Sequence, residues 1–251
     1  MTDNLAVARD LELSYGSHVA LRASSFEIPL VGATAVIGPN GSGKSTLLSA
    51  LAGLVPATGG TLTVLGRDPA AVRNRISYVL QATPVSVGVP ITVREAVMMG
   101  RYPRVGLFRR FSKADHAAVD GAMAHMAITD LADRHLYELS GGQRQRVLVA
   151  QGIAQEHEVL LLDEPLTGLD ITSARTIDDL IHGQRADGCS VVLTTHDLDE
   201  ARAADWVVLV SGQVIAYGPA DQVCTRRNLE VAFGLGSLHD WDGFLNDPHE
   251  P

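Results

Sequence analysis

GPNGSGKST, residues 38–46, satisfies the pattern G-x-x-x-x-G-K-[ST]. It follows the apolar run TAVI (34–37) and precedes the helical run TLLSALAGL (46–54). Glycines at such a junction let several N–H groups surround one anion, and the positive end of the helix adds to this. A glycine-rich turn that binds nothing is the alternative, which the flanking strand, helix and lysine together disfavour. The candidate nucleotide-binding residues are Gly38, Pro39, Asn40, Gly41, Ser42, Gly43, Lys44, Ser45 and Thr46.

Two further apolar runs end in polar residues. VLLLD (159–163) is followed by Glu164, and SVVLTTH (190–196) ends at His196. Parallel strands that are buried on both faces have this pattern, and the residues between the two runs have helical spacing. A phosphate site needs a carboxylate to hold magnesium, here Asp163 together with Ser45, and a neighbour to orient or deprotonate water, here Glu164. Two solvated acids capping a strand are the alternative.

The chain has an α/β organisation with a helical middle. The short runs TLTVLG (61–66), ISYVLQ (76–81) and WVVLVSG (206–212) indicate further strands. Residues 92–155 are mostly helix formers, and Ser112 followed three residues later by Asp115 predicts a helix start with a capping box. We therefore expect a parallel α/β core with a helical insertion.

The motif LSGGQ, Leu139 to Gln143, opens the helical run RQRVLVAQGIAQ. Ser140 is suited to cap that helix, and the glycines expose its first N–H groups, so the motif predicts a second anion site. Two phosphate sites in one chain call for an explanation. The order of phosphate loop, LSGGQ, VLLLDEP and TTH resembles the ATP-binding subunit of an ABC transporter.

The resemblance covers about residues 5–219 and implies ATP and Mg²⁺ as ligands. It implies a P-loop NTPase core with a mainly parallel sheet, an N-terminal antiparallel β region and an inserted helical subdomain. The expected domain is 1–223, with its core at about 1–88 and 156–223 and the helical subdomain at about 89–155. Residues 224–251 are expected to form a short C-terminal tail whose polar end frays.

The resemblance also implies roles for single residues. Ser140, Gly141, Gly142 and Gln143 would complete the ATP site of a second copy in a head-to-tail homodimer. Tyr15 would stack on adenine, Gln81 would contact magnesium and water, His196 would contact the γ-phosphate, and Asp170 would lie in a loop that crosses the dimer interface. Gly168 stands where the family commonly has alanine. Because Glu164 is present, we expect an active ATPase.

Bulk properties restrict the partners. The formal net charge of -9 over 251 residues opposes nucleic-acid binding, and Cys189 and Cys224 lack the spacing of a disulfide or zinc site. No run of about 18 apolar residues occurs. The resemblance implies transmembrane permease subunits on separate chains, an indirect link to a solute-binding protein, and a peripheral location on the cytoplasmic face of the membrane. A soluble ABC protein acting on nucleic acid or ribosomes is the less favoured class.

The cargo is predicted from resemblance alone. The stretch from Val93 to Asp170 is most similar to the ATPases of zinc and manganese importers. GRYP (100–103) also recurs in importers of iron chelates, so a siderophore or cobalamin system is the rival. No residue of this subunit is expected to touch the cargo.

Overall fold

The computed structural model describes residues 4–30, 32–81, 90–106, 109–186 and 188–234 and contains two β-sheets. The smaller sheet is antiparallel, in the order β2 (His18–Pro29), β1 (Asn4–Tyr15), β4 (Gly59–Val64). The main sheet has the order β5 (Ile76–Val79), β6 (Val159–Leu162), β7 (Ser190–Thr195), β3 (Gly32–Ile37), β8 (Trp206–Val210), β9 (Val214–Pro219). It is parallel except for β9, which pairs antiparallel with β8. The predicted fold class is confirmed.

The strand register brings the three motif-bearing strand ends together. Ile37 at the end of β3 pairs with Thr195 of β7, and Leu162 at the end of β6 pairs with Leu193 of β7. Because the strands are parallel, the phosphate loop, the acidic pair and the TTH sequence all leave the same edge of the sheet. Ligands bind at this edge in open α/β sheets.

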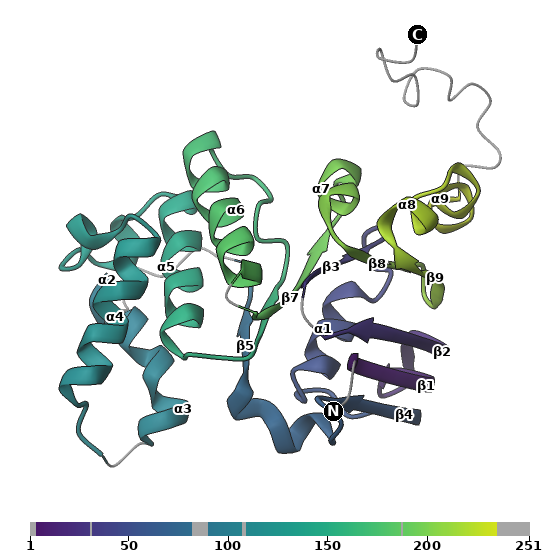
Figure 1. Cartoon of the computed structure of the whole chain (residues 1–251), viewed down its shortest axis with the longest axis horizontal. Helices are drawn as coiled ribbons and strands as arrows, with labels where there is room; N and C mark the ends of the chain where they lie inside the picture. The colour runs from purple at the N-terminus through teal and green to yellow at the C-terminus, as the bar shows by residue number, and fades with distance from the viewer. Residues whose placement is uncertain (1–3, 31, 82–89, 107–108, 187, 235–251) are drawn as a thin grey trace, which may run out of the picture.

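Alternation along β6 explains how both faces of the main sheet are covered. Val159 and Leu161 pack in one core with α1 (Lys44–Leu51) and the antiparallel sheet. Leu160 and Leu162 pack in a second core with the helical elements. Successive side chains of a strand point to opposite faces, so a strand buried on both faces must be apolar throughout. The two layers lie on opposite sides of the main sheet in Figure 1.

The helical lobe forms one side of the molecule (Figure 1). The predicted capping box is present: Ser112 N–H donates to Asp115 Oδ2 at 2.8 Å, and Asp115 N–H donates to Ser112 Oγ at 3.3 Å. A second capping box joins Thr92 and Glu95 at the start of α2. The lobe consists of α2 (Val93–Met98), η2 (Met99–Arg101), α3 (Tyr102–Val105), α4 (Lys113–His125), η3 (Thr129–Leu131), η4 (Leu136–Glu138) and α5 (Gly141–Ala154).

A buried arginine holds three of these helices together. Arg101 Nε donates to Asp115 Oδ1 at 2.9 Å, and Arg101 Nη1 donates to the carbonyl of Ala154 at 2.6 Å and to Glu156. Hydrogen bonds from the Ser112 hydroxyl and N–H, and then from Arg101, lower the pKa of Asp115 to about 2. Removing one partner of a buried pair leaves an uncompensated charge, so this contact fixes how η2, α4 and α5 meet.

The remaining helices cover the rest of the core. They are η1 (Pro69–Arg75), α6 (Ile171–Ala186), α7 (Leu198–Ala203), α8 (Ala220–Val223) and α9 (Arg226–Phe233). The structure extends ordered packing beyond residue 223: Leu229 and Ala232 of α9 are buried against β8, α7 and α8. The domain boundary stays a prediction, and the polar end of the tail (235–251) lies outside the described residues. Within the described ranges, none of the helices has both the length and the apolar character needed to span a membrane.

Candidate nucleotide site

The phosphate loop connects β3 to α1 where the backbone has no room for side chains. Gly43 has φ +103°, and a Cβ there would lie 2.5 Å from the carbonyl oxygen of Ala20. A Cβ on Gly38 would overlap the carbonyl oxygen of Val210. Only glycine fits these two positions. The loop therefore curves tightly and ends at the first N–H groups of α1, which is the geometry that binds an anion.

Lys44 folds back over the loop that precedes it. Its Nζ donates to the carbonyl oxygens of Gly38 at 2.8 Å and Pro39 at 3.2 Å, and the side chain is buried. Burial lowers the pKa of Lys44, and the charges of Glu164 and Asp163 oppose that shift. The only cation held by the loop is thus placed beside its N–H groups and faces the acidic pair.

Asp163 is the centre of the polar contacts between the strand ends. Its Oδ1 accepts a hydrogen bond from Ser45 Oγ at 3.0 Å and another from Thr194 Oγ1 at 2.6 Å. The hydroxyl of Tyr78 lies 3.5 Å from the other oxygen, Oδ2, and burial raises the pKa of Tyr78 to about 12. The tyrosine is therefore a neutral donor, and the carboxylate is held from three elements.

Glu164 follows in an unusual backbone conformation. Its φ is +46°, in the left-handed region that costs energy for a residue with a Cβ. Its N–H donates to Thr194 Oγ1 at 2.8 Å. The side chain is half-buried. Strain of this kind, held by a specific hydrogen bond, is typical of functional sites.

The LSGGQ motif forms the start of α5 as predicted. Ser140 caps the helix by accepting from Gln143 N–H at 3.2 Å, and Gln143 Oε1 accepts from Ser140 N–H at 2.9 Å. Ser140 and Gly141 are exposed. Gly142 is buried, and a Cβ there would lie 2.6 Å from Ser173 Oγ and 2.7 Å from Asp170 Oδ2.

Asp170 has partners within its own chain. Ser173 donates to it twice, from N–H to Oδ1 at 2.9 Å and from Oγ to Oδ2 at 2.8 Å. These hydrogen bonds lower the pKa of Asp170 and fix the start of α6. Asp170 thus joins α6 to the glycine pair of LSGGQ. Its proposed place in a dimer interface is a separate matter and stays a prediction.

Gln81 and His196 leave the same edge of the main sheet as the acidic pair, and Tyr15 belongs to the smaller sheet. Tyr15 ends β1 with 52% of its surface exposed. Gln81 follows β5 and His196 follows β7, and both side chains are exposed. Exposure leaves all three available to a ligand, and their individual roles remain predictions.

Two residues of the site were not predicted from the sequence. Thr194 is fully buried and contacts both acidic residues, and Tyr78 approaches Asp163 from β5. A hydroxyl in the last positions of an otherwise apolar buried strand was the available signal for Thr194, because a buried hydroxyl needs a partner. The sequence gives no corresponding signal for Tyr78, which looks like any other tyrosine of a strand.

The donor set fits a magnesium ion. Ser45 and Asp163 present a hydroxyl and a carboxylate oxygen next to the phosphate loop, and Mg²⁺ is bound through one or two carboxylates together with substrate phosphates. Among the described residues, no group of three or more His, Cys, Asp or Glu side chains is arranged as a metal site of its own. Ser42 Oγ is buried in the loop and has no hydrogen-bond partner in the described part of the chain.

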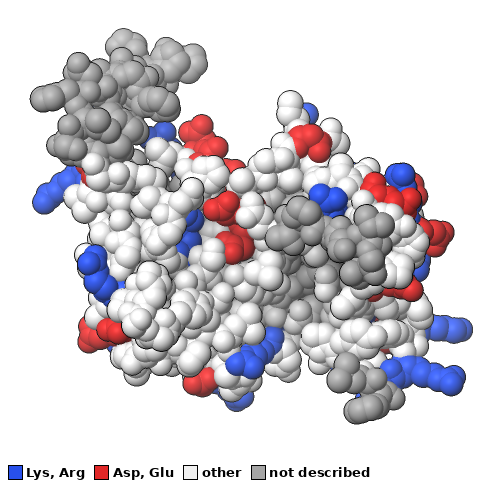
Figure 2. Space-filling model, turned by 180° about the vertical axis from the view of Figure 1, so that it is seen from behind, with Lys and Arg blue, Asp and Glu red and all other residues white. Residues whose placement is uncertain are grey.

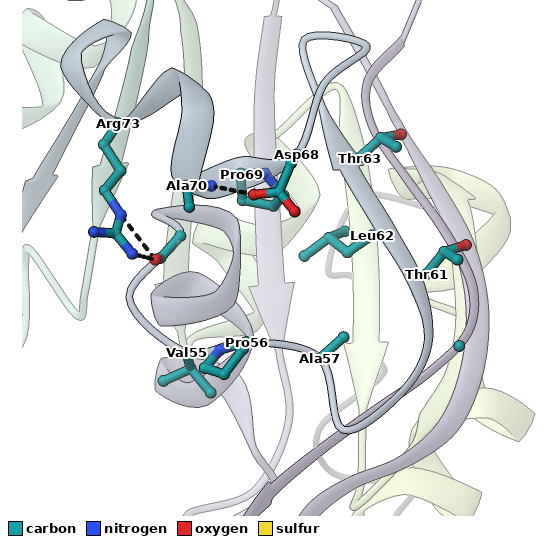
Figure 3. A pocket seen from close by; sticks show the side chains of 12 residues that line it. Val55, Pro56, Ala57, Thr61, Leu62, Thr63, Asp68, Pro69, Ala70 and Arg73 are labelled. Atoms are coloured by element: carbon teal, nitrogen blue, oxygen red, sulfur yellow. Dashed lines mark hydrogen bonds between the residues drawn. The ribbon is translucent and has the colours of Figure 1, made fainter.

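A separate hollow of about 540 Å³ lies between the end of α1, β4 and η1 (Figure 3). Its two charged side chains are already engaged: Arg73 donates to the Gly53 carbonyl, and Asp68 accepts from Ala70 N–H. On the face shown in Figure 2, described basic and acidic side chains are interspersed. Neither feature resembles a nucleotide or nucleic-acid site.

The comparisons with known proteins agree on one family, that of the ABC transporters. The sequence profile of the ABC transporter family matches residues 21–167. The chain is 36% identical to the manganese transport system ATP-binding protein MntB of Bacillus subtilis (strain 168), over 92% of this chain and 91% of that protein. It is 35% identical to the zinc transport system ATP-binding protein TroB of Treponema pallidum (strain Nichols), over 90% and 85%.

Two further likenesses bear on cargo and fold. The chain is 36% identical to the chelated iron transport system membrane protein YfeB of Yersinia pestis, over 98% of this chain and 85% of that protein. Its structure resembles that of an ABC transporter in an inward-facing conformation, with a TM-score of 0.81 and 29% identity, covering 93% of this chain and 90% of the other.

Proposed function

The chain belongs to the ABC transporter family, and on this premise we propose that it is the ATP-hydrolysing subunit of a bacterial transporter that imports manganese or zinc. The assignment of the cargo rests on the similarity to manganese and zinc transport subunits along nine-tenths of the chain. ATP hydrolysis itself is the activity of the family, and the chain has the phosphate loop and the acidic pair that this activity requires.

We assign each residue of the site a separate role in ATP hydrolysis. Lys44 and the loop N–H groups bind the phosphates, and Ser45 and Asp163 would hold Mg²⁺, which neutralises phosphate charge when bound. Glu164 orients the attacking water or takes its proton. We assign His196 to the γ-phosphate, Gln81 to the magnesium and water, and Tyr15 to the adenine.

We propose that two copies face each other head to tail. Ser140 and Gly141 are exposed at the N-terminus of the 14-residue helix α5, and nothing lies within 4 Å of where a Cβ on Gly141 would be. This free helix end is an anion site that the chain's own phosphate loop does not use. A second copy's ATP is the anion that fits it.

Ser140→Arg tests the shared site. A bulky cation in the open space at the start of α5 is expected to lower ATP turnover about a hundred-fold or more, while ATP binding to the single chain is kept. Steady-state hydrolysis and nucleotide titration measure the two quantities. Mixing Ser140→Arg with Lys44→Ala chains leaves one intact composite site per heterodimer, so part of the activity should return. A Ser140→Arg chain with undiminished turnover contradicts the arrangement.

We place the chain on the membrane periphery, bound to permease subunits on other chains. The region 89–155 is the proposed contact module, and a solute-binding protein is linked only through the permease. Exposed apolar side chains support this: Leu80 next to Gln81 and Met99 in the helical lobe expose 57% and 45% of their surface. A membrane partner that covers them would connect its movement to the residue proposed to contact magnesium and water.

Deleting the gene is expected to lower cellular manganese or zinc under starvation for that metal by about two-fold or more. The cargo assignment predicts restoration by added metal or by a plasmid copy of the gene. Elemental analysis of the deletion strain measures the change. A plasmid copy with Glu164→Gln is the matched control and should fail to restore uptake, because its fold is kept and turnover is lost.

A chelated-iron importer is the second candidate, favoured by the likeness to YfeB. It predicts unchanged manganese and zinc in the deletion strain together with lost growth on an iron chelate. That result would overturn the cargo and leave the proposed ATPase residues in the same roles.

A further inference from the structure

Thr194 lies in β7, two residues before His196, and its side chain is completely buried. Its hydroxyl contacts both members of the acidic pair on the neighbouring strand end. We propose that Thr194 is a positioning residue for ATP hydrolysis, whose hydroxyl holds Asp163 and Glu164 in their working geometry. The proposal rests on the ATPase function given above and concerns the first residue of the TTH sequence, to which no role has been assigned so far.

The hydrogen-bond geometry leaves the hydroxyl no freedom. A threonine hydroxyl has one proton to donate and lone pairs to accept. The proton goes to Asp163 Oδ1 at 2.6 Å, and the oxygen accepts Glu164 N–H at 2.8 Å. One hydroxyl therefore connects the carboxylate of the first acid to the backbone of the second.

Thr194 contacts one oxygen of Asp163, Oδ1, whereas Tyr78 contacts the other, Oδ2. Oδ1 accepts from Thr194 and also from Ser45, so both hydroxyls hold the same oxygen. The two donors come from β7 and from the first turn of α1. The carboxylate is thereby turned toward the phosphate loop.

The contact with Glu164 holds a strained backbone. With φ at +46°, this residue has a conformation that a side chain with a Cβ disfavours. The hydrogen bond from its N–H to Thr194 opposes relaxation to an ordinary φ. Without an acceptor there, the peptide is free to turn, and the carboxylate that orients water turns with it.

The same hydroxyl aligns two strands that carry different parts of the site. β6 leads into Glu164 and β7 leads into His196. A shift of about 1 Å between reacting groups is enough to cost about a hundred-fold in rate. The role of Thr194 should therefore appear in turnover and leave ATP binding almost unchanged.

Four variants of the full chain test the assignment. Thr194→Val keeps the shape and removes the hydroxyl, and its kcat should fall about ten- to a hundred-fold. Thr194→Ala and Thr194→Ser both lose the methyl group, but only serine keeps the hydroxyl, so serine alone should stay within about three-fold of the wild type. Thr34→Val makes the same change at a buried threonine of β3 and should leave kcat unchanged.

The readouts are kcat, KM for ATP, ATP affinity by calorimetry without Mg²⁺, and melting temperature. Loss of kcat in the Val and Ala variants with affinity kept within about three-fold supports the proposal. A Val variant with wild-type turnover overturns it, and so does a Ser variant as slow as the Ala variant. If the Val variant does not fold, the Ala and Ser pair decides. A wild-type chain without hydrolysis would contradict the ATPase function, whereas equal turnover in all variants contradicts only Thr194.

Discussion

Lys44→Ala is expected to lower the affinity of the chain for ATP by about a hundred-fold or more. A charged group that hydrogen-bonds a phosphate contributes about 1.5–3 kcal/mol per bond, and 2.7 kcal/mol is about a hundred-fold in affinity. Lys44 is buried within the loop and has only carbonyl partners there, so its ammonium is available to phosphate oxygens. Nucleotide titration measures the effect.

Lys113→Ala is the matched control, because Lys113 is the only other lysine of the chain and lies exposed at the start of α4. It should bind ATP as the wild type does. The melting temperature of Lys113→Ala should equal that of the wild type, and that of Lys44→Ala should fall by no more than the loss of its two hydrogen bonds to loop carbonyls implies. A Lys44→Ala chain with wild-type affinity would remove the phosphate role from this loop.

The parts of the fold that could be predicted from the sequence are those determined by residues close together along the chain. The start of α5 at Ser140 and of α4 at Ser112 follow from side chains three residues apart. The buried strands β6 and β7 follow from continuous apolar runs. The antiparallel N-terminal region was expected only by resemblance, since β1 alternates irregularly and its pairing with β2 contains register shifts.

Other features depend on contacts between distant segments. Thr194 and Asp163 are 31 residues apart, and Tyr78 and Asp163 are 85 apart, so no spacing rule brings them together. Arg101 contacts Ala154, which lies 53 residues further along the chain, and no spacing rule predicts this contact either. α9 is a short helix within the region that the sequence predicts to be a tail. Only its packing on β8, α7 and α8 shows that it is part of the core.

Glu164→Gln is expected to stop turnover while ATP binding is kept. The amide preserves the size of the side chain and loses the charge that orients or deprotonates water, and general bases contribute about a hundred- to ten-thousand-fold. The backbone contact to Thr194 uses the N–H of this residue and is untouched by the change. Hydrolysis should therefore fall by that factor, with melting temperature unchanged.

Glu158→Gln is the control, because Glu158 directly precedes β6 at its other end and is exposed beside Arg75. Its turnover should equal that of the wild type. If two chains share two nucleotides, the Glu164→Gln chain should accumulate as an ATP-bound dimer, because the step that reopens the dimer is blocked. Light scattering with ATP and Mg²⁺ measures its mass. A Glu164→Gln chain that stays monomeric and hydrolyses ATP at the normal rate would take the catalytic role away from Glu164, and the left-handed backbone at that position would then need another cause.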